Sequence, residues 1–477
     1  MQTCNPDVRP IFRPRFGISA LSLVLLTVVF CSLAAQAQIL PGMPWYDTSG
    51  SPIKAHGAGI IQVGSTYYMI GEIDSSGGGF QGINCYSSTN LTNWTLIGDI
   101  LPPQPSGDLV TTDLVERPKV LYNSATGKYV MWLHIWSGDA VGYATSSSVC
   151  GTYTYLGSSQ PLGNQSFDIG SFQDTDGTAY LLSANYNNGI IVYQMSSDYL
   201  SPVSIVDGVS TWGDREAPAM FKANGYYFLI CSHETGWTSN DDQYSYATSI
   251  SGPWSALADI ATAGTNTWNS QSTFVQPVTG SSGTTYIYMG DRWLSGQIEN
   301  SPYVWLPLTV SGSTLSLPWV NNWSVNISTG TWTNNDFPYL YKGSYHELVN
   351  VNSGLCLDAV STTEGTQAEG VLCDASNLQE WDVTSSGSNY YIANQGSGYL
   401  LEDPGNSKSS GSPVDTWPSN GGSNQSWLFT NVGQNNYTIK NTYSGLCLGI
   451  AGGAETSGSA IHQGTCNGGI NQMWYQH

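Results

Sequence analysis

Four polar residues stand 48 to 55 residues apart in this sequence, namely Glu116, Asp168, Glu216 and Gln271. Each precedes a tyrosine of a similar aromatic segment by 11 to 15 residues, which predicts that equivalent structural units present them to one cavity. Carboxylates that share a cavity raise one another's pKa, so that one of them stays protonated. Glycosidic bond cleavage needs such an acid to protonate the leaving oxygen and a second group to handle water. The alternative is that these acids cap turns and face solvent.

Other chemistries find little support in the sequence. It contains no nucleophilic serine or cysteine motif and no glycine-rich phosphate loop, and its six histidines are scattered. We therefore expect no metal site and no cofactor. The net charge of −21, from 13 Lys and Arg against 34 Asp and Glu, would repel nucleic acid and excludes it as a partner.

The elements that must position the four polar residues follow from composition. Charged residues make up only 10% of the 477 residues, which excludes coiled coils and long charged helices. The 54 glycines, 29 tyrosines and 17 tryptophans are typical of short strands joined by polar turns. An all-β fold is therefore predicted.

A repeat of about 50 residues divides the first part of the chain. The aromatic segment recurs five times, at residues 63–72, 125–135, 175–185, 223–233 and 281–291. Several strands per unit at this period predict a five-bladed β-propeller, which we place at residues 38–340. Because the innermost strand of each blade runs along a central axis, the polar residues ahead of each repeat should meet in one funnel. In the first unit this position holds His56-Gly57.

A second repeat occupies residues 341–477. Gln-x-Trp occurs at 379–381, 425–427 and 472–474, with spacings of 46 and 47 residues. Three such units resemble the ricin-type β-trefoil, carbohydrate-binding module family 13, in which the Trp is mainly a core residue. Cysteines at matching places in two repeats predict the disulfides Cys356–Cys373 and Cys447–Cys466. The propeller keeps three cysteines, an odd number, so at least one buried free thiol is expected.

Residues 55–293 resemble glycoside hydrolase family 43, whose members are five-bladed inverting exo-enzymes. Phe167-Asp168 followed by Phe172-Gln-Asp-Thr-Asp-Gly resembles the family's pKa-modulator motif, and Arg215-Glu216-Ala217-Pro218 resembles its general-acid motif. The resemblance implies that Asp168 modulates the pKa and that Glu216 is the proton donor. The family's usual base, an Asp ahead of the first inner strand, is replaced here by Ala55-His56-Gly57.

This departure is similar to the exo-β-1,3-galactanase branch of the family. The supporting segments are His56-Gly-Ala-Gly, Val115-Glu-Arg-Pro-Lys, His233-Glu-Thr-Gly-Trp and Ser270-Gln-Ser-Thr. The resemblance implies that Gln271 stands in for the base. It also implies that Glu116 and Asp168 hold the terminal galactose, with Glu72, Asn188 and Thr235 as further contacts. Because an amide is a poor base, Glu116 is an alternative base.

In trefoils of this family, sugar lies between an acid at the start of a repeat and an aromatic residue eight positions before the Gln. The first repeat offers Asp358 without an aromatic partner, and the second offers both Glu402 and Trp417. The third has glycine at both positions, so we expect it to be silent and the first to be weak. The alternative is a trefoil that serves only as a spacer or docking body.

Residues 1–37 are predicted to be a signal peptide, because three arginines precede an apolar run and Ala35-Gln36-Ala37 follows it. An uncleaved membrane anchor is the alternative. The prediction is a monomeric protein, secreted or periplasmic, that leaves the membrane after cleavage. It should act on a polysaccharide and release galactose from β-1,3-galactan with inversion. The alternatives are an α-L-arabinofuranosidase or β-xylosidase of the same family, or a propeller that binds glycan without cleaving it.

Overall fold

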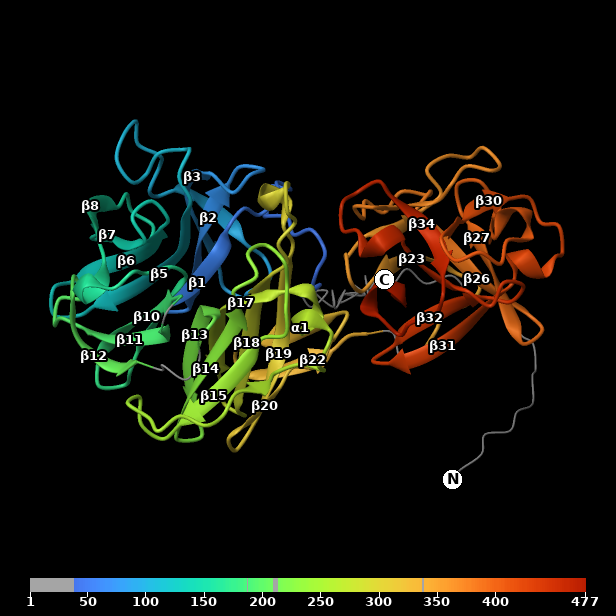
Figure 1. Cartoon of the computed structure of the whole chain (residues 1–477). Coiled ribbons are helices and arrows are strands. Elements are labelled where there is room, and N and C mark those ends of the chain that lie inside the picture. Colours follow the sequence, from blue (N-terminus) through green and yellow to red (C-terminus); the bar gives the residue numbers. More distant parts are fainter. Residues whose placement is uncertain (1–37, 187, 209–212, 337–338) are drawn as a thin grey trace, which may run out of the picture. The chain divides into compact units, whose positions relative to one another are not determined.

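The computed structural model describes residues 38–477 except 187, 209–212 and 337–338 (Figure 1). The predicted signal peptide lies outside these residues. Within the described part of the chain, no helix combines the length and hydrophobicity that crossing a membrane requires.

Five antiparallel sheets of four strands each follow one another along the chain. The first contains β1 (His56–Val63), β2 (Thr66–Asp74), β3 (Phe80–Ser88) and β4 (Thr95–Asp99). The second contains β5 (Val115–Asn123), β6 (Lys128–Ile135), β7 (Ala140–Ser146) and β8 (Thr154–Ser159). The third contains β9 (Ile169–Gln173), β10 (Ala179–Asn185), β11 (Gly189–Met195) and β12 (Pro202–Gly208).

The fourth sheet contains β13 (Arg215–Ala223), β14 (Tyr226–His233), β15 (Gln243–Ala247) and β16 (Ala258–Asp259). The fifth contains β17 (Gln271–Thr279), β18 (Thr284–Asp291), β19 (Tyr303–Ser311) and β20 (Thr314–Ser316), preceded by the short helix α1 (Asn266–Asn269). The first strands of the five sheets contact one another in a ring, from β1 through β5, β9, β13 and β17 back to β1. The sheets are therefore blades around one axis, and the predicted five-bladed propeller is confirmed (Figure 1).

The recurring aromatic segments form the second strand of each blade, namely β2, β6, β10, β14 and β18. Their alternating side chains pack between neighbouring blades. For example, Trp132 of β6 lies in one buried cluster with Leu181 of β10 and Tyr193 of β11. The polar residues ahead of these segments consequently fall at the start of the innermost strands, all at the same end of the axis.

The propeller's cysteines bear out the prediction and add to it. Cys231 is free and buried, as expected. Cys85 of β3 and Cys150, which follows β7, form a disulfide between the first two blades that the sequence analysis did not pair. After the fifth blade, β21 (Trp323–Asn326) pairs with β22 (Thr331–Asn334), and the backbone of Trp323 bonds to that of Ile39.

The C-terminal part is a β-trefoil, as predicted. Its first repeat contains β23 (Tyr345–Asn350), β24 (Cys356–Asp358), β25 (Glu369–Val371) and β26 (Glu380–Ser386). The second contains β27 (Asn389–Asn394), β28 (Leu400–Glu402), β29 (Ser412–Pro413), β30 (Asp415–Trp417) and β31 (Trp427–Gly433). The third contains β32 (Asn436–Asn441), β33 (Cys447–Ile450), β34 (Ser459–Gly464) and β35 (Met473–Gln476).

The three Gln-x-Trp tryptophans are core residues. Trp381, Trp427 and Trp474 are fully buried, and each indole N–H donates to a backbone carbonyl of its own repeat, at 2.8 to 3.1 Å. The disulfides Cys356–Cys373 and Cys447–Cys466 are both present, as predicted.

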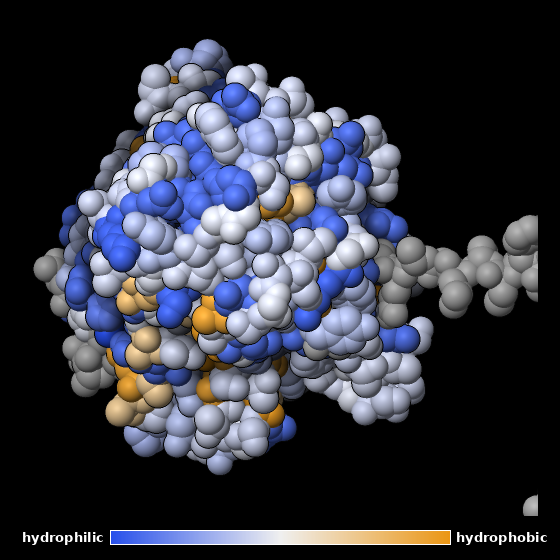
Figure 2. All heavy atoms as spheres, turned by 90° about the vertical axis from the view of Figure 1, so that its right-hand side faces the viewer, coloured by the Kyte–Doolittle hydropathy of each residue, from blue (hydrophilic) through white to orange (hydrophobic). Residues whose placement is uncertain are grey.

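The surface agrees with the polar but weakly charged composition. Hydrophilic residues cover most of the face in Figure 2, where hydrophobic residues appear in small groups.

Candidate active site

A cavity of about 550 Å³ lies at the end of the axis where the inner strands begin. Its lining brings together Glu72, Glu116, Asp168, Glu216 and Gln271. The funnel expected from the sequence is therefore present, and these four acids come from four different blades.

A larger cavity of about 780 Å³ is lined by the remainder of the same inner strands. Its Asp174 is the only acid in the lining and forms an ion pair with Lys222 at 2.8 Å. The carboxylate cluster, rather than cavity size, identifies the first cavity as the candidate active site.

Glu116 and Glu216 each stand at a β-bulge at the start of their strand. The register shifts between Glu116 and Lys119 in β5, and between Glu216 and Ala219 in β13. The residues that follow the two acids, Arg117 and Ala217, both have φ of 55°, in the left-handed region. A bulge leaves a residue unpaired and redirects side chains, and such strain is common at functional sites.

The backbone N–H groups released by these bulges bind carboxylates of the preceding blade. The four bonds are Gly57 to Asp291 Oδ2 (3.0 Å), Arg117 to Glu72 Oε2, Ala217 to Asp168 Oδ2 (3.1 Å) and Ser272 to Asp242 Oδ2 (3.0 Å). We call Glu72, Asp168, Asp242 and Asp291 the inter-blade carboxylates. They hold neighbouring blades in register around the cavity, so these acids have a structural role in addition to any role toward substrate.

Glu72 also accounts for the missing base in the first blade. A Cβ atom on Gly57 would lie 2.6 Å from Glu72 Oε2, and Gly57 has φ of 55°. The carboxylate of Glu72 therefore fills the space that a side chain at position 57 would need. Burial and the nearby Asp74 and Glu116 raise the pKa of Glu72 well above its usual range.

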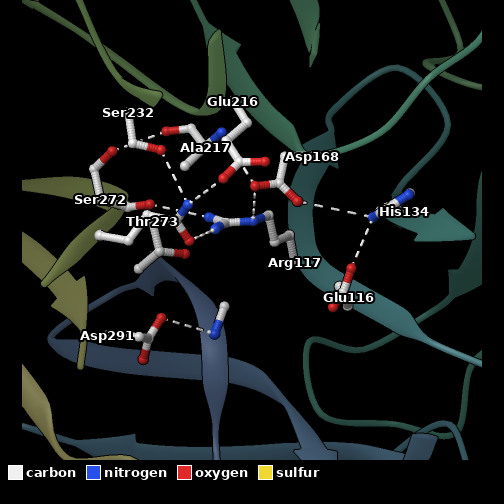
Figure 3. A network of polar contacts seen from close by, with 12 residues as sticks. Glu116, Arg117, His134, Asp168, Glu216, Ala217, Ser232, Ser272, Thr273 and Asp291 are labelled. Carbon is white, nitrogen blue, oxygen red and sulfur yellow. Dashed lines mark hydrogen bonds and ion pairs between the residues drawn. The ribbon is translucent and has the colours of Figure 1, made fainter. Parts of the chain in front are cut away.

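Arg117 connects the acids across the cavity floor (Figure 3). Its Nε lies 2.9 Å from Asp168 Oδ2, and its Nη2 donates to Gln271 Oε1 at 2.5 Å. Its buried guanidinium offsets part of the negative charge that would otherwise make the cluster costly. The sequence analysis quoted Arg117 within a motif but gave it no role, although it is a rare cation beside a predicted site acid.

Glu216 has the properties of a proton donor. Burial, followed by the neighbouring charge of Asp168, raises its pKa to about 9. Its Oε1 accepts a hydrogen bond from Gln271 Nε2 at 2.9 Å. At neutral pH the carboxyl group is therefore protonated and able to deliver a proton.

Glu116 is held by a histidine that the sequence analysis did not select. His134 Nδ1 lies 2.9 Å from Glu116 Oε2 and 3.8 Å from Asp168 Oδ1 (Figure 3). These three side chains lie close enough together to surround a metal ion. Hydrogen bonding between His134 and Glu116 and the ion pair between Arg117 and Asp168 explain why these side chains lie together without a metal ion. The absence of a metal or cofactor stays a prediction.

Aromatic side chains form the walls of the cavity. Trp136 and Tyr186 are 46% and 44% exposed, and Tyr186 stacks on Phe167 with ring centroids 3.8 Å apart. On the other side, Trp237 meets Trp293 edge-on at 5.0 Å. Flat apolar rings beside carboxylates suit the mixed faces of a sugar. The sequence analysis missed these walls, because aromatic residues are abundant throughout the chain.

Two predicted contacts do not line the cavity. Asn188 is exposed in the turn between β10 and β11, where it donates to Asn185 Oδ1 at 3.1 Å. The side chain of Thr235 donates to Thr238 O at 2.5 Å and accepts from Asn240 at 2.7 Å. Only the backbone of Thr235 reaches the site, through a hydrogen bond to Glu216. Their proposed contact with substrate was carried over from a resemblance, and it stays a prediction.

In the trefoil, the predicted acids are buried and bonded to their Gln-x-Trp glutamines. Asp358 accepts from Gln379 at 3.0 Å and from the backbone of Val360 at 2.5 Å, so both of its oxygens are engaged. Glu402 accepts from Gln425 at 2.8 Å through Oε2. Trp417 is 39% exposed and lies on the same face of the β28–β30 pair as Glu402. The second repeat thus has the acid and the ring on one face, with Trp417 opposite Leu400 and Glu402 opposite Asp415.

Comparisons with known proteins agree with this architecture. Residues 52–258 match the model of glycosyl hydrolases family 43, and residues 323–417 and 423–476 match that of the ricin-type β-trefoil lectin domain-like family. An exo-β-1,3-galactanase structure from Clostridium thermocellum is 35% identical, with a TM-score of 0.61 over 92% of this chain and 99% of that one. A Phanerochaete chrysosporium exo-β-1,3-galactanase with β-1,3-galactotriose is 30% identical, with a TM-score of 0.62 over 93% of each chain.

A curated relative is more distant. A xylan 1,3-β-xylosidase of a Vibrio species is 27% identical over 196 residues, which span 36% of this chain and 35% of that protein.

A carboxylate cluster at the mouth of a five-bladed propeller, followed by a lectin-type trefoil, defines a glycoside hydrolase that acts on glycans. The similarity to the Clostridium enzyme extends over both parts of the molecule. The chain belongs to glycosyl hydrolases family 43.

Proposed function

We propose that this protein is a secreted exo-acting hydrolase that releases galactose from β-1,3-galactan with inversion of the anomeric configuration. The observation that carries the proposal is Glu216, a half-buried acid with a pKa of about 9 that lies beside Gln271 and shares with Glu116 a cavity with aromatic walls. The substrate class is supported by the two exo-β-1,3-galactanase structures, which resemble the chain over more than nine-tenths of its length.

The reaction needs two proton transfers. Glu216 gives its proton to the glycosidic oxygen of the leaving sugar as the bond to C1 breaks. A water molecule attacks C1 from the opposite face and gives a proton to a second group, Gln271 or Glu116. Asp168 keeps Glu216 protonated through its negative charge, and Arg117 holds Asp168 in place at 2.9 Å.

The trefoil supports action on a polymer. Glu402 and Trp417 of the second repeat provide a carboxylate and a half-exposed ring, which would tether the enzyme to galactan and raise its local concentration. Disulfides in both parts of the chain support an oxidising, extracellular location.

Product analysis tests the proposal. We expect galactose as the product from unbranched β-1,3-galactan, with the α-anomer appearing first in an NMR time course. Longer fragments would contradict exo action, and an initial β-anomer would contradict inversion.

A β-xylosidase is the second candidate, supported by the 27% identical xylosidase. The discriminating measurement is the ratio of kcat/KM on β-1,3-galactobiose to that on β-1,3-xylobiose. We expect galactobiose to be preferred by about 30- to 150-fold, because an unfilled hydroxymethyl contact costs on the order of 2–3 kcal/mol. Preference for xylobiose would assign the second candidate.

A further inference from the structure

The larger cavity of about 780 Å³ lies at the other end of the propeller axis, and we call it the far cavity. It is lined by the later residues of β1, β5, β9, β13 and β17, whereas the candidate active site lies where these strands begin. The two cavities share no lining residue. Between them lies Lys119 of β5, whose stem packs against Gly59 and whose ammonium donates to Gly57 O at 2.6 Å. The far cavity is therefore separate from the candidate active site.

A polar side chain from each blade contributes to the lining of the far cavity. In chain order these residues are Gln62, Tyr122, Gln173, Lys222 and Gln276. The charge of Lys222 is offset by Asp174, the only acid in the lining. The groups left to meet a ligand are therefore mostly neutral amides and hydroxyls.

Two of the glutamine amides have a fixed orientation. Gln62 Nε2 donates to Gly64 O at 3.1 Å, and Gln276 Nε2 donates to Pro277 O at 2.6 Å. Because a carbonyl oxygen only accepts hydrogen bonds, the bonded atom must be the NH₂ nitrogen in each case. The amide oxygens of both residues are consequently left without a hydrogen-bond partner among the residues that the structure describes.

The third glutamine has the same orientation. Gln173 Nε2 donates to the hydroxyl of Tyr199 at 2.9 Å, and that hydroxyl uses its own hydrogen to bind Gly177 O. The hydroxyl oxygen of Tyr199 must therefore accept from Gln173, which fixes the bonded atom as nitrogen. The far cavity thus has three amide oxygens that can accept hydrogen bonds, on blades one, three and five.

This set of groups selects the chemistry of a ligand. Free amide oxygens need donors, which an anion such as a carboxylate cannot supply. A cation is disfavoured by the two lysines of the lining. Neutral hydroxyl groups both donate and accept. The oxygen of Gln276 should gain most from such a partner, because this residue is only 7% exposed.

An aromatic ring completes the far cavity. Tyr122 is 41% exposed, and its ring centroid lies 4.8 Å from that of Tyr129, which supports it. An exposed ring beside hydrogen-bonding groups suits the apolar face of a sugar. The cavity volume also falls within the range of about 300–1,000 Å³ that is usual for ligand sites.

We propose that the far cavity is a second glycan-binding site of the propeller, which holds a neutral sugar through the three free amide oxygens and the ring of Tyr122. The single acid of this site is paired with a lysine, so the site binds sugar without cleaving it. It goes beyond the proposed hydrolysis, because it gives the propeller a contact with polymer that is independent of both the candidate active site and the trefoil. Such a contact would add to the tethering of the enzyme on galactan.

Affinity electrophoresis in gels that contain unbranched β-1,3-galactan tests the proposal. The full chain carries Glu216→Gln to prevent hydrolysis and Trp417→Ala to weaken the trefoil site. Adding Tyr122→Ala should raise the apparent Kd for galactan about 5-fold, with an unchanged midpoint of thermal unfolding. Tyr46→Ala is the matched control, because Tyr46 is 52% exposed and lies outside the far cavity. An unchanged Kd for the Tyr122→Ala chain would overturn the proposal.

A second variant guards against a folding defect. If Tyr122→Ala lowers the thermal midpoint, Gln62→Leu decides, because Gln62 is exposed and its replacement removes one of the free amide oxygens. We expect about a 3-fold higher Kd for this variant, and an unchanged Kd would again overturn the proposal.

Gels that contain polygalacturonate test the charge of the ligand. Tyr122→Ala should migrate there like its parent. Weaker binding of this variant to polygalacturonate but not to galactan would overturn the assignment to a neutral sugar. The binding measurements do not need hydrolysis, so an inactive wild-type protein would contradict the proposed function without deciding the role of the far cavity.

Discussion

A glutamine amide donates to the carboxyl group of a glutamate in both parts of this molecule, but the two pairs have different surroundings. In the propeller, Gln271 binds Glu216 at 2.9 Å, and its oxygen binds the side chains of Arg117 and Trp293. In the trefoil, Gln425 binds Glu402 at 2.8 Å, and its other contacts are to the backbone at Pro418 and Asn420.

The third trefoil repeat separates the glutamine from the acid. Gln472 makes the equivalent backbone contacts, to Thr465 O at 3.0 Å and from the N–H of Asn467 at 3.0 Å, although Gly449 replaces the acid. The trefoil glutamine is therefore a backbone clamp, for which the carboxylate is optional. In the propeller every partner of the amide is a side chain, and two of these, Arg117 and Glu216, are ionisable. A glutamine–glutamate pair can therefore belong to a candidate active site, where the amide binds other side chains, or to a structural turn, where the amide binds the backbone.

The largest expected contrast comes from the same substitution at both acids. Glu216→Gln should lower turnover of β-1,3-galactobiose about 1,000-fold, because it removes the proton donor. Glu402→Gln should leave this turnover unchanged, because Glu402 belongs to the lectin domain. Initial rates on galactobiose measure both, and substantial activity in Glu216→Gln would show that another acid donates the proton.

The charge next to Glu216 should set the alkaline limb of the pH–rate profile. In the proposed mechanism activity requires protonated Glu216, so we expect activity below the pKa of about 9 and its loss as the pH rises through that value. Asp168→Asn removes the negative charge that raises the pKa of Glu216. The positive charge of Arg117, which lowers this pKa, remains. We expect the alkaline limb of kcat/KM to move down by about one pH unit, whereas an unchanged limb would remove Asp168 from the role of pKa modulator.

Substitution of the trefoil glutamines should lower the free energy of unfolding of the trefoil and leave the hydrolytic activity unchanged. Gln425→Ala leaves the buried Glu402, the carbonyl of Pro418 and the N–H of Asn420 without this partner. We expect a loss of about 2–4 kcal/mol in the trefoil's unfolding free energy, measured by denaturant titration. Gln472→Ala is the matched control with no acid, and its loss should be smaller. Equal losses would mean that Glu402 does not depend on its glutamine.

The smallest effect should appear in binding to polymer. Trp417→Ala removes the exposed ring beside Glu402, and we expect about 10-fold weaker binding to galactan in a pull-down titration, with unchanged turnover of galactobiose. Val371→Ala at the equivalent position of the first repeat is the control and should bind normally. Full binding by Trp417→Ala would favour a trefoil that acts as a spacer.

The repeat made much of the site predictable. The repeat period placed Glu116, Glu216 and Gln271 at equivalent strand starts. Because the inner strands of a propeller surround one axis, these residues were predicted to meet in one cavity. The role of Arg117 was not predictable, because it depends on a bulge with φ of 55° that no sequence period indicates. The Cys85–Cys150 disulfide joins residues 65 positions apart on different blades, with no matching repeat to suggest the pairing.

The trefoil gave a similar outcome. Its disulfides followed from cysteines at matching places in the internal repeat, and its buried tryptophans followed from the resemblance to the ricin-type trefoil. The same resemblance selected Glu402 and Trp417 as a sugar-binding pair, which stays a prediction. That both oxygens of Asp358 are used within its own repeat required coordinates, because one of the bonds comes from a backbone N–H.

The inter-blade carboxylates link the structure of the cavity to the closure of the propeller ring. Each of them accepts a hydrogen bond from the next blade, and Asp291 of the last blade binds Gly57 of the first, so the joint that closes the ring has the same chemistry as three of the four other joints. If one of these blades were lost, a backbone N–H group on one side of the gap and a carboxylate on the other would lose their hydrogen-bond partners. The lining of the cavity and the closure of the ring therefore depend on some of the same side chains, because Glu72 and Asp168 both join two blades and line the cavity.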